Sequence, residues 1–226
     1  MLYKLQRIFW IITILSVFLI LITGLFLRND KIDYVFHGSI LKQPKTIVNF
    51  SLQGIDKKIY NNASFYGRWT MLFFGFTNCT SVCPVTMAEL AKMYQILKAK
   101  NISVLPKIVL VSIDPLRDEL SKLSRYVKSF NQDFYGVSGS SQIINDMAQD
   151  MGIVYKKINL NEEKNIINYD IQHSGAILLF NPSGKLVALF TLPHHAMQLA
   201  NDYQWLILNS NSLFGNSFYE NSNLSH

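Results

Sequence analysis

Cysteine is scarce in this chain of 226 residues. The only two, Cys79 and Cys83, stand close together in the stretch FTNCTSVCP. A disulfide between them would close a very short loop and would restrict the unfolded chain little, so it would be a weak structural staple. Pairs this close are more often redox-active or metal-binding. A purely structural bridge remains open at this point as the alternative.

Charge is also sparse, at 16% of residues, and no cluster of Lys and Arg marks a track for phosphates. Residues 1–31 carry +3 of the net charge of +6, so the rest of the chain is close to balanced. Nucleic-acid binding is therefore not expected. Internal repeats and long linkers are absent too. With 49% hydrophobic residues, the chain is expected to form one folded domain with appendages.

The longest apolar run is Ile8 to Leu27, which contains no charged residue. A helix of that length covers about 30 Å, the thickness of a bilayer's hydrocarbon core. No small-x-small cleavage site and no lipobox-type cysteine follows the run, so we expect an uncleaved membrane anchor, with a cleaved signal peptide as the alternative. Lys4 and Arg7 precede the run and favour a cytoplasmic amino terminus. The expected location is the inner membrane, single-pass, with the domain in the periplasm.

The residues around the two cysteines predict a strand, a loop and a helix. Residues 69–76 (WTMLFFGF) form a continuous apolar run, which is typical of a strand buried on both faces. Pro84 suits the first turn of a helix, and residues 85–100 have apolar side chains at helical spacing. Cys83 is therefore expected at a helix N-terminus, with Cys79 in the preceding loop. Backbone N–H groups and the helix dipole there favour a thiolate, the form needed for redox attack or metal ligation.

The rest of the chain alternates strands and helices, as expected for an α/β domain. Strands are predicted at 104–113, 134–137 and 154–158, and helices up to 130 and at 142–151. A hairpin is predicted from SGAILLF to KLVALFT, and a closing helix at 195–208. This order is that of a thioredoxin-like fold. The expected organisation is an anchor at 1–31, a linker at 32–44, the domain at 45–208, and a disordered Asn- and Ser-rich tail at 209–226.

Three motifs in this order, FGFTNCTSVCP, VSIDPLRD and HSGAILLFNPSGKL, make residues 45–208 resemble the Sco/SenC family. Members of that family have a thioredoxin-like fold and assist copper delivery to cytochrome c oxidase. The resemblance implies that Cys79, Cys83 and His173 bind one copper ion, as Cu(I) or Cu(II). His173 is expected at the start of the first strand of the predicted hairpin. The resemblance also implies a partner, the copper-receiving subunit of the oxidase. Two thiolates are soft donors that suit Cu(I), and an imidazole is accepted by Cu(II) as well.

Other potential ligands are expected to serve structure instead. His37 and His226 lie outside any pattern that supports metal binding. The side chains of the adjacent His194 and His195 diverge, so these two histidines are expected to bind no metal. The methionines are expected to fill the core: Met71, Met87, Met93, Met147, Met151 and Met197. Asp114 is interpreted first as a turn and cap residue, and second as a residue that shapes the site.

The sequence departs from the family pattern at two positions beside these ligands. Many members have an acidic residue between the cysteines and another just before the histidine, whereas this chain has Ser81 and Gln172, with Asp170 two residues earlier. Carboxylates near the site would favour a cation and contacts with a partner. Their loss affects the expected Cu(II) affinity and the partner more than it affects Cu(I) binding.

Two classes of function follow. The first is a metallochaperone, which is not an enzyme and needs no small-molecule substrate. The second is an enzyme, either a thiol-disulfide oxidoreductase that acts on cysteines of an oxidase subunit or a thiol peroxidase. Copper transfer needs His173 as a third ligand, whereas thiol exchange does not, so this residue separates the two classes.

Overall fold

The computed structural model describes residues 2–26, 34–159 and 169–215. The chain divides into two units, residues 1–35 and 36–226. In the described part of the first unit, helix α1 covers Leu2–Phe26. Within the part of the chain that the structure describes, no helix is sufficiently long and apolar to cross a membrane. The transmembrane anchor expected over residues 8–27 is therefore not found, although residues 8–26 are helical as expected.

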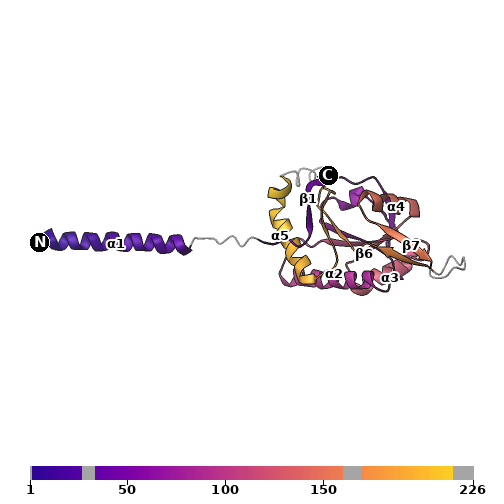
Figure 1. The fold of residues 1–226 in the computed structure, drawn as a ribbon, viewed down its shortest axis with the longest axis horizontal. Coiled ribbons are helices and arrows are strands. Elements are labelled where there is room, and N and C mark those ends of the chain that lie inside the picture. Colours follow the sequence, from indigo (N-terminus) through magenta and orange to yellow (C-terminus); the bar gives the residue numbers. More distant parts are fainter. Residues whose placement is uncertain (1, 27–33, 160–168, 216–226) are drawn as a thin grey trace. The chain divides into compact units, whose positions relative to one another are not determined.

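The second unit is built around one mixed sheet, as predicted for an α/β domain (Figure 1). Its strands follow the order β1-β10-β9-β4-β5-β6-β2-β3. The pairs β4–β5 and β5–β6 are parallel, and the other neighbours are antiparallel. The bounds of the strands are β1 Ser39–Lys45, β2 Ser51–Gly54, β3 Ile59–Asn61, β4 Thr70–Gly75, β5 Lys107–Ser112, β6 Tyr135–Ser138, β9 Ile177–Phe180 and β10 Leu186–Phe190.

The sheet's centre is the apolar run predicted as a buried strand. Every residue of β4 is buried, and β4 lies between β5 and β9. Such full burial is typical of a central strand with neighbours on both sides and helices on its faces. The cysteine loop follows β4 directly, so the core of the domain determines where that loop begins.

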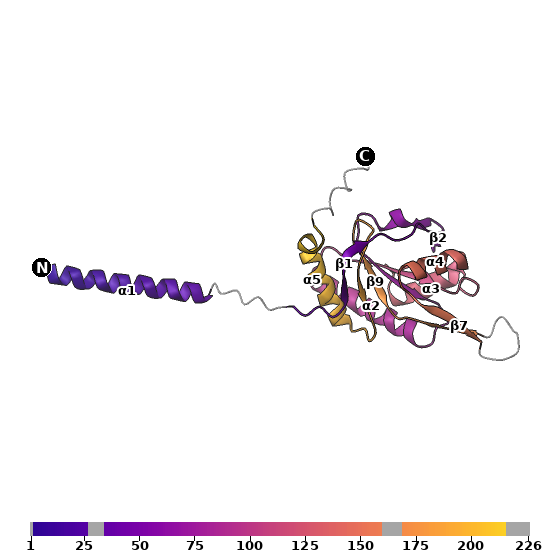
Figure 2. The ribbon, with the colours of Figure 1, turned by 45° about the horizontal axis from the view of Figure 1, so that its top comes forward.

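Helices connect and cover the strands (Figures 1 and 2). Their bounds are η1 Asn62–Phe65, a 3-10 helix, α2 Val82–Ala99, α3 Leu120–Phe130, α4 Ser141–Asp150 and α5 Ala196–Phe214. Pro84 lies in the first turn of α2, where the missing N–H group costs no helical hydrogen bond. Helix α4 begins after Ser140, whose hydroxyl accepts a hydrogen bond from the N–H of Ile143 at 3.3 Å.

A separate two-stranded sheet carries the candidate histidine ligand. Strand β7 (Tyr155–Asn159) pairs antiparallel with β8 (Tyr169–His173), and Tyr155 is opposite His173. This hairpin extends away from the main sheet in Figure 2. The sequence interpretation had His173 at the start of the strand that is now β9, which is wrong, because His173 ends β8. The segment YDIQH alternates buried and exposed residues, as expected of a strand covered on one face.

Two elements of regular secondary structure extend beyond the expected boundaries of the domain. Strand β1 begins at Ser39, inside the segment interpreted as a linker, and pairs with β10 at an edge of the main sheet. Helix α5 continues to Phe214, inside the segment interpreted as a disordered tail. The remainder of that tail, residues 216–226, lies outside the described residues.

Candidate metal centre

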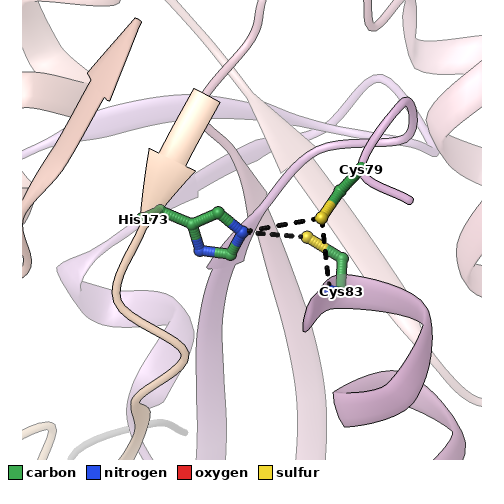
Figure 3. A group of neighbouring side chains, drawn as sticks. All are labelled: Cys79, Cys83 and His173. Atoms are coloured by element: carbon green, nitrogen blue, oxygen red, sulfur yellow. Dashed lines mark hydrogen bonds between the residues drawn. The ribbon is translucent and has the colours of Figure 1, made fainter. Parts of the chain in front are cut away.

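The side chains of Cys79, Cys83 and His173, which come from separate segments of the chain, converge on one another (Figure 3). The Nε2 atom of His173 lies 3.2 Å from the sulfur of Cys83 and 3.8 Å from the sulfur of Cys79. All three donor atoms lie within 4.8 Å of one another. Among the described residues, no other group of three His, Cys, Asp or Glu side chains meets this criterion. The structure thus brings together the three residues that the sequence singled out.

The two cysteines occupy the positions predicted from the sequence. Cys83 lies in the first turn of α2 and is fully buried, and Cys79 lies in the preceding loop, partly exposed. The N–H of Cys83 donates to the sulfur of Cys79 at 3.4 Å. Gly75, the last residue of β4, leaves room for the buried sulfur, since a Cβ atom there would lie 2.9 Å from Cys83 Sγ. Gly75 was not predicted as a site residue, although a glycine that ends a buried strand indicates the close approach of another group.

The imidazole of His173 is oriented by its neighbours. Its Nδ1 lies 3.0 Å from the carbonyl oxygen of Ser174. A carbonyl can only accept a hydrogen bond, so Nδ1 carries a hydrogen and donates it, and Nε2 is the ring nitrogen that faces the sulfurs. The rings of Phe73 and Phe76 pack on the imidazole, each with its centroid 5.9 Å away. This arrangement fixes the tautomer that metal ligation through Nε2 requires.

The two thiols differ in acidity. The pKa of Cys79 lies well below its ordinary value, chiefly because the Cys83 side chain hydrogen-bonds its sulfur, with His173 and backbone N–H groups also contributing. The pKa of Cys83 is raised by the neighbouring Cys79 and by burial. Cys79 is therefore the thiolate of the pair, and Cys83 is a protonated thiol while no cation is bound.

Asp118 holds the loop that precedes Cys79. Its buried carboxylate accepts hydrogen bonds from the backbone N–H of Thr77 at 3.0 Å, from the Thr77 hydroxyl, and from the Ser112 hydroxyl at 2.7 Å. Thr77 lies two residues before Cys79, and Ser112 is the last residue of β5. One carboxylate thus ties the cysteine loop to the end of the adjacent parallel strand.

Asp114 and Arg117 hold the strand that carries His173. The carboxylate of Asp114 forms an ion pair with Arg117 and accepts a hydrogen bond from the Tyr169 hydroxyl. Arg117 also donates to the backbone carbonyl of Tyr169 at 2.8 Å and lies 3.8 Å from the centre of its ring. Burial raises the pKa of Tyr169 to about 12, so its hydroxyl stays protonated as a donor.

The segment DPLRD therefore positions both halves of the site: Asp118 acts on the cysteine loop, and Asp114 with Arg117 acts on β8. The turn expected at Asp114 is present, because its carbonyl accepts from the N–H groups of Arg117 and Asp118. The buried side chain of Asp114 shapes the site, a role that was expected only as the second possibility.

The other three histidines that the structure describes are absent from the three-residue cluster. His194 is buried and its Nε2 donates to the carbonyl of Gly175 at 2.6 Å. His195 is exposed at the N-terminus of α5, and His37 contacts the carboxylate of Asp202. His226 lies outside the described residues.

The methionines mostly fill the core, as predicted. Of the six methionines after Met1, five are buried, namely Met71, Met87, Met93, Met147 and Met151. Met197 differs, because 53% of its surface is exposed at the start of α5. The two positions that lack the expected acidic residues, Ser81 and Gln172, are both exposed beside the site, as is Asp170.

Comparison with known proteins agrees with this architecture. The SCO1/SenC family model matches residues 39–208. A SCO2-like protein of Rickettsia conorii is 30% identical over 144 residues, which are 64% of this chain and 68% of the relative.

Two solved structures are similar in both fold and sequence. The copper-bound ScoI of Arabidopsis thaliana has a TM-score of 0.66 and 29% identity, covering 72% of this chain and 98% of that one. The apo Sco1 protein of Thermus thermophilus has a TM-score of 0.65 and 32% identity, covering 77% and 99%. These likenesses confirm the thioredoxin-like fold predicted from the order of the elements.

The difference in thiol acidity predicts selective alkylation. In the reduced protein, iodoacetamide at pH 6 should modify Cys79 and leave Cys83 unmodified, since the lowered pKa of Cys79 keeps it a thiolate there. Between pH 8 and pH 6 its rate should change little, whereas an ordinary thiol slows about tenfold per pH unit. Peptide mass spectrometry measures both sites, with Cys79→Ser as the control that should resist labelling. Equal labelling of the two cysteines would contradict this assignment.

The contacts of Asp118 predict a large loss of stability on its removal. Asp118→Ala leaves three donors without their acceptor, so the free energy of unfolding should fall by about 3 kcal/mol or more. The matched control is Asp133→Ala, which removes an exposed carboxylate paired with Lys98 at 3.1 Å and should cost less than about 1 kcal/mol. Urea unfolding of the two variants measures the difference. Similar losses in both would mean that Asp118 does not hold the loop.

Proposed function

This chain belongs to the SCO1/SenC family, and we propose that it is a copper metallochaperone. In this proposal Cys79, Cys83 and His173 bind one copper ion, and the protein passes it to the copper-receiving subunit of cytochrome c oxidase. The observation that carries the proposal is the convergence of two sulfurs and one imidazole nitrogen within 4.8 Å.

The donor set suits an ion that must be held and then released. Two sulfur ligands favour Cu(I), and the added nitrogen makes the site acceptable to Cu(II). Three protein ligands leave a coordination position for a ligand of the acceptor. Cys83 is buried while Cys79 and His173 are partly exposed, so an acceptor would approach from the side of the latter two. The ion is cargo in this scheme, and no small-molecule substrate is turned over.

A second candidate function is thiol-disulfide exchange, which the unequal thiols favour. The Cys79 thiolate would attack a disulfide of a partner and form a mixed disulfide, releasing one partner thiol. Cys83, after losing its proton, would then attack Cys79 and release the second partner thiol. The partner disulfide gains two electrons and the C-x3-C pair is oxidised to a disulfide. The arrangement of Cys79 and Cys83 supports this chemistry, in which His173 would only contribute to the lowered pKa of Cys79 and would bind no metal.

The compartment of the domain is a separate part of the proposal, supported by Lys4 and Arg7 before the uncharged run at 8–27. A periplasmic reporter fused after residue 45 should be active, and the same fusion without residues 1–31 should be inactive. Activity confined to a cytoplasmic reporter would contradict a periplasmic location.

Replacement of His173 separates the two candidate functions. His173→Ala removes one of three donors and leaves both thiols, so Cu(II) affinity should fall by at least about 10 to 100-fold. Cu(I) affinity should fall less, because two thiolates satisfy Cu(I) in linear geometry. Copper titration measures both, anaerobically for Cu(I) and through thiolate charge-transfer bands for Cu(II). His195→Ala, which removes an exposed imidazole outside the three-residue cluster, is the control and should bind copper normally.

Unchanged Cu(II) binding by His173→Ala would overturn the ligand assignment. A parallel disulfide-exchange assay tests the alternative. Rapid exchange by a wild-type protein that binds no copper would favour the oxidoreductase and reject the metallochaperone.

A further inference from the structure

A buried histidine outside the cluster contacts the backbone beside the candidate ligand. His194 is 7% exposed, and its Nε2 lies 2.6 Å from the carbonyl oxygen of Gly175. Because the carbonyl only accepts, Nε2 carries the hydrogen and donates it. Gly175 is two residues beyond His173, and the carbonyl of the residue between them accepts the Nδ1 hydrogen of His173. His194 thus holds the backbone next to the group that orients His173.

The same backbone is packed tightly from two sides. A Cβ atom at Gly175 would lie 2.6 Å from a methyl carbon of Leu192 and 2.9 Å from a methyl carbon of Val82. Leu192 precedes His194 by two residues, and Val82 is adjacent to Cys83 on α2. The segment after His173 is therefore held between the His194 segment and the start of the cysteine helix.

The His194 segment is itself attached to the cysteine helix. The N–H of Ala196, at the start of α5, donates to the carboxylate of Glu89 at 2.8 Å. Glu89 lies on α2, the helix that contains Cys83. Contacts therefore run from Cys83 along α2 to Glu89, through α5 to His194 and on to the backbone that orients His173. This closed route joins the histidine to the cysteines independently of the main sheet.

We propose that His194 is a positioning residue for His173, which keeps its imidazole in the orientation and tautomer that ligation needs. This inference rests on the copper site proposed above. Burial also lowers the pKa of His194, so the ring stays neutral with its single hydrogen on Nε2. His194 is not a ligand in this scheme, as expected from the sequence, but His194→Ala should still weaken copper binding.

The test compares His194→Ala and His194→Gln with the matched control His195→Ala. Removing the donor in His194→Ala should lower Cu(II) affinity about 10 to 100-fold, which is the usual effect of mutating groups that orient metal ligands. Cu(I) affinity should change much less, because both thiolates remain. The amide of His194→Gln can donate from a similar position and should restore most of the Cu(II) affinity. His195→Ala should match the wild type.

A copper-free measurement accompanies the titrations. Long-range ¹H–¹⁵N NMR of the reduced full chain should show His173 with its hydrogen on Nδ1 in the wild type and in His194→Gln. In His194→Ala it should show a mixture of tautomers. Thermal unfolding of each variant measures its Tm, which shows whether a loss of copper affinity comes only from a loss of stability.

Wild-type Cu(II) affinity in His194→Ala, or an unchanged His173 tautomer, would overturn the inference. Equal losses of Cu(I) and Cu(II) that follow the fall in Tm would also overturn it, because the role would then be purely structural. Failure of folded His194→Gln to restore Cu(II) affinity would count against the hydrogen bond. If the wild type bound no copper, the proposed function would fail, and the NMR measurement would still decide the role of His194.

Discussion

The contact between His173 Nε2 and the two sulfurs joins residues that lie 94 and 90 positions apart in the chain. This contact requires three parts of the chain to lie side by side: the loop after β4, the first turn of α2, and the last residue of β8. The fully buried strand β4 fixes the first two, because the loop and helix follow it directly. Strand β8 belongs to a separate hairpin, so its end must be held by side chains.

The buried polar residues after β5 fix the position of β8 and of the cysteine loop. Asp118 binds the cysteine loop, whereas Asp114 and Arg117 bind β8 through Tyr169. Buried carboxylates are costly unless their charge and lone pairs are satisfied, and here each has several donors. The two halves of the site are therefore attached to one short segment. Preorganisation of this kind limits the rearrangement required when a cation binds.

Local pattern was sufficient to predict the cysteines' surroundings. An apolar run, a proline in the first helical turn and helical spacing placed Cys83 at a helix N-terminus, as observed. The setting of His173 was not predictable in the same way, because β8 is short and its partner β7 is separated from it in sequence. The sequence resemblance identified His173 correctly as a neighbour of the cysteines but assigned it to the wrong strand. Gly75 and His194 were missed because their roles depend on contacts between distant segments.

The central claim is that one copper ion is bound by two sulfurs and one imidazole nitrogen. X-ray absorption at the copper edge, on the reduced full chain loaded anaerobically with Cu(I), tests it most directly when copper is also counted per chain. The account predicts one copper per chain, with two sulfur neighbours and one nitrogen neighbour. A copper-free protein, or copper bound without sulfur or without the nitrogen, would contradict it.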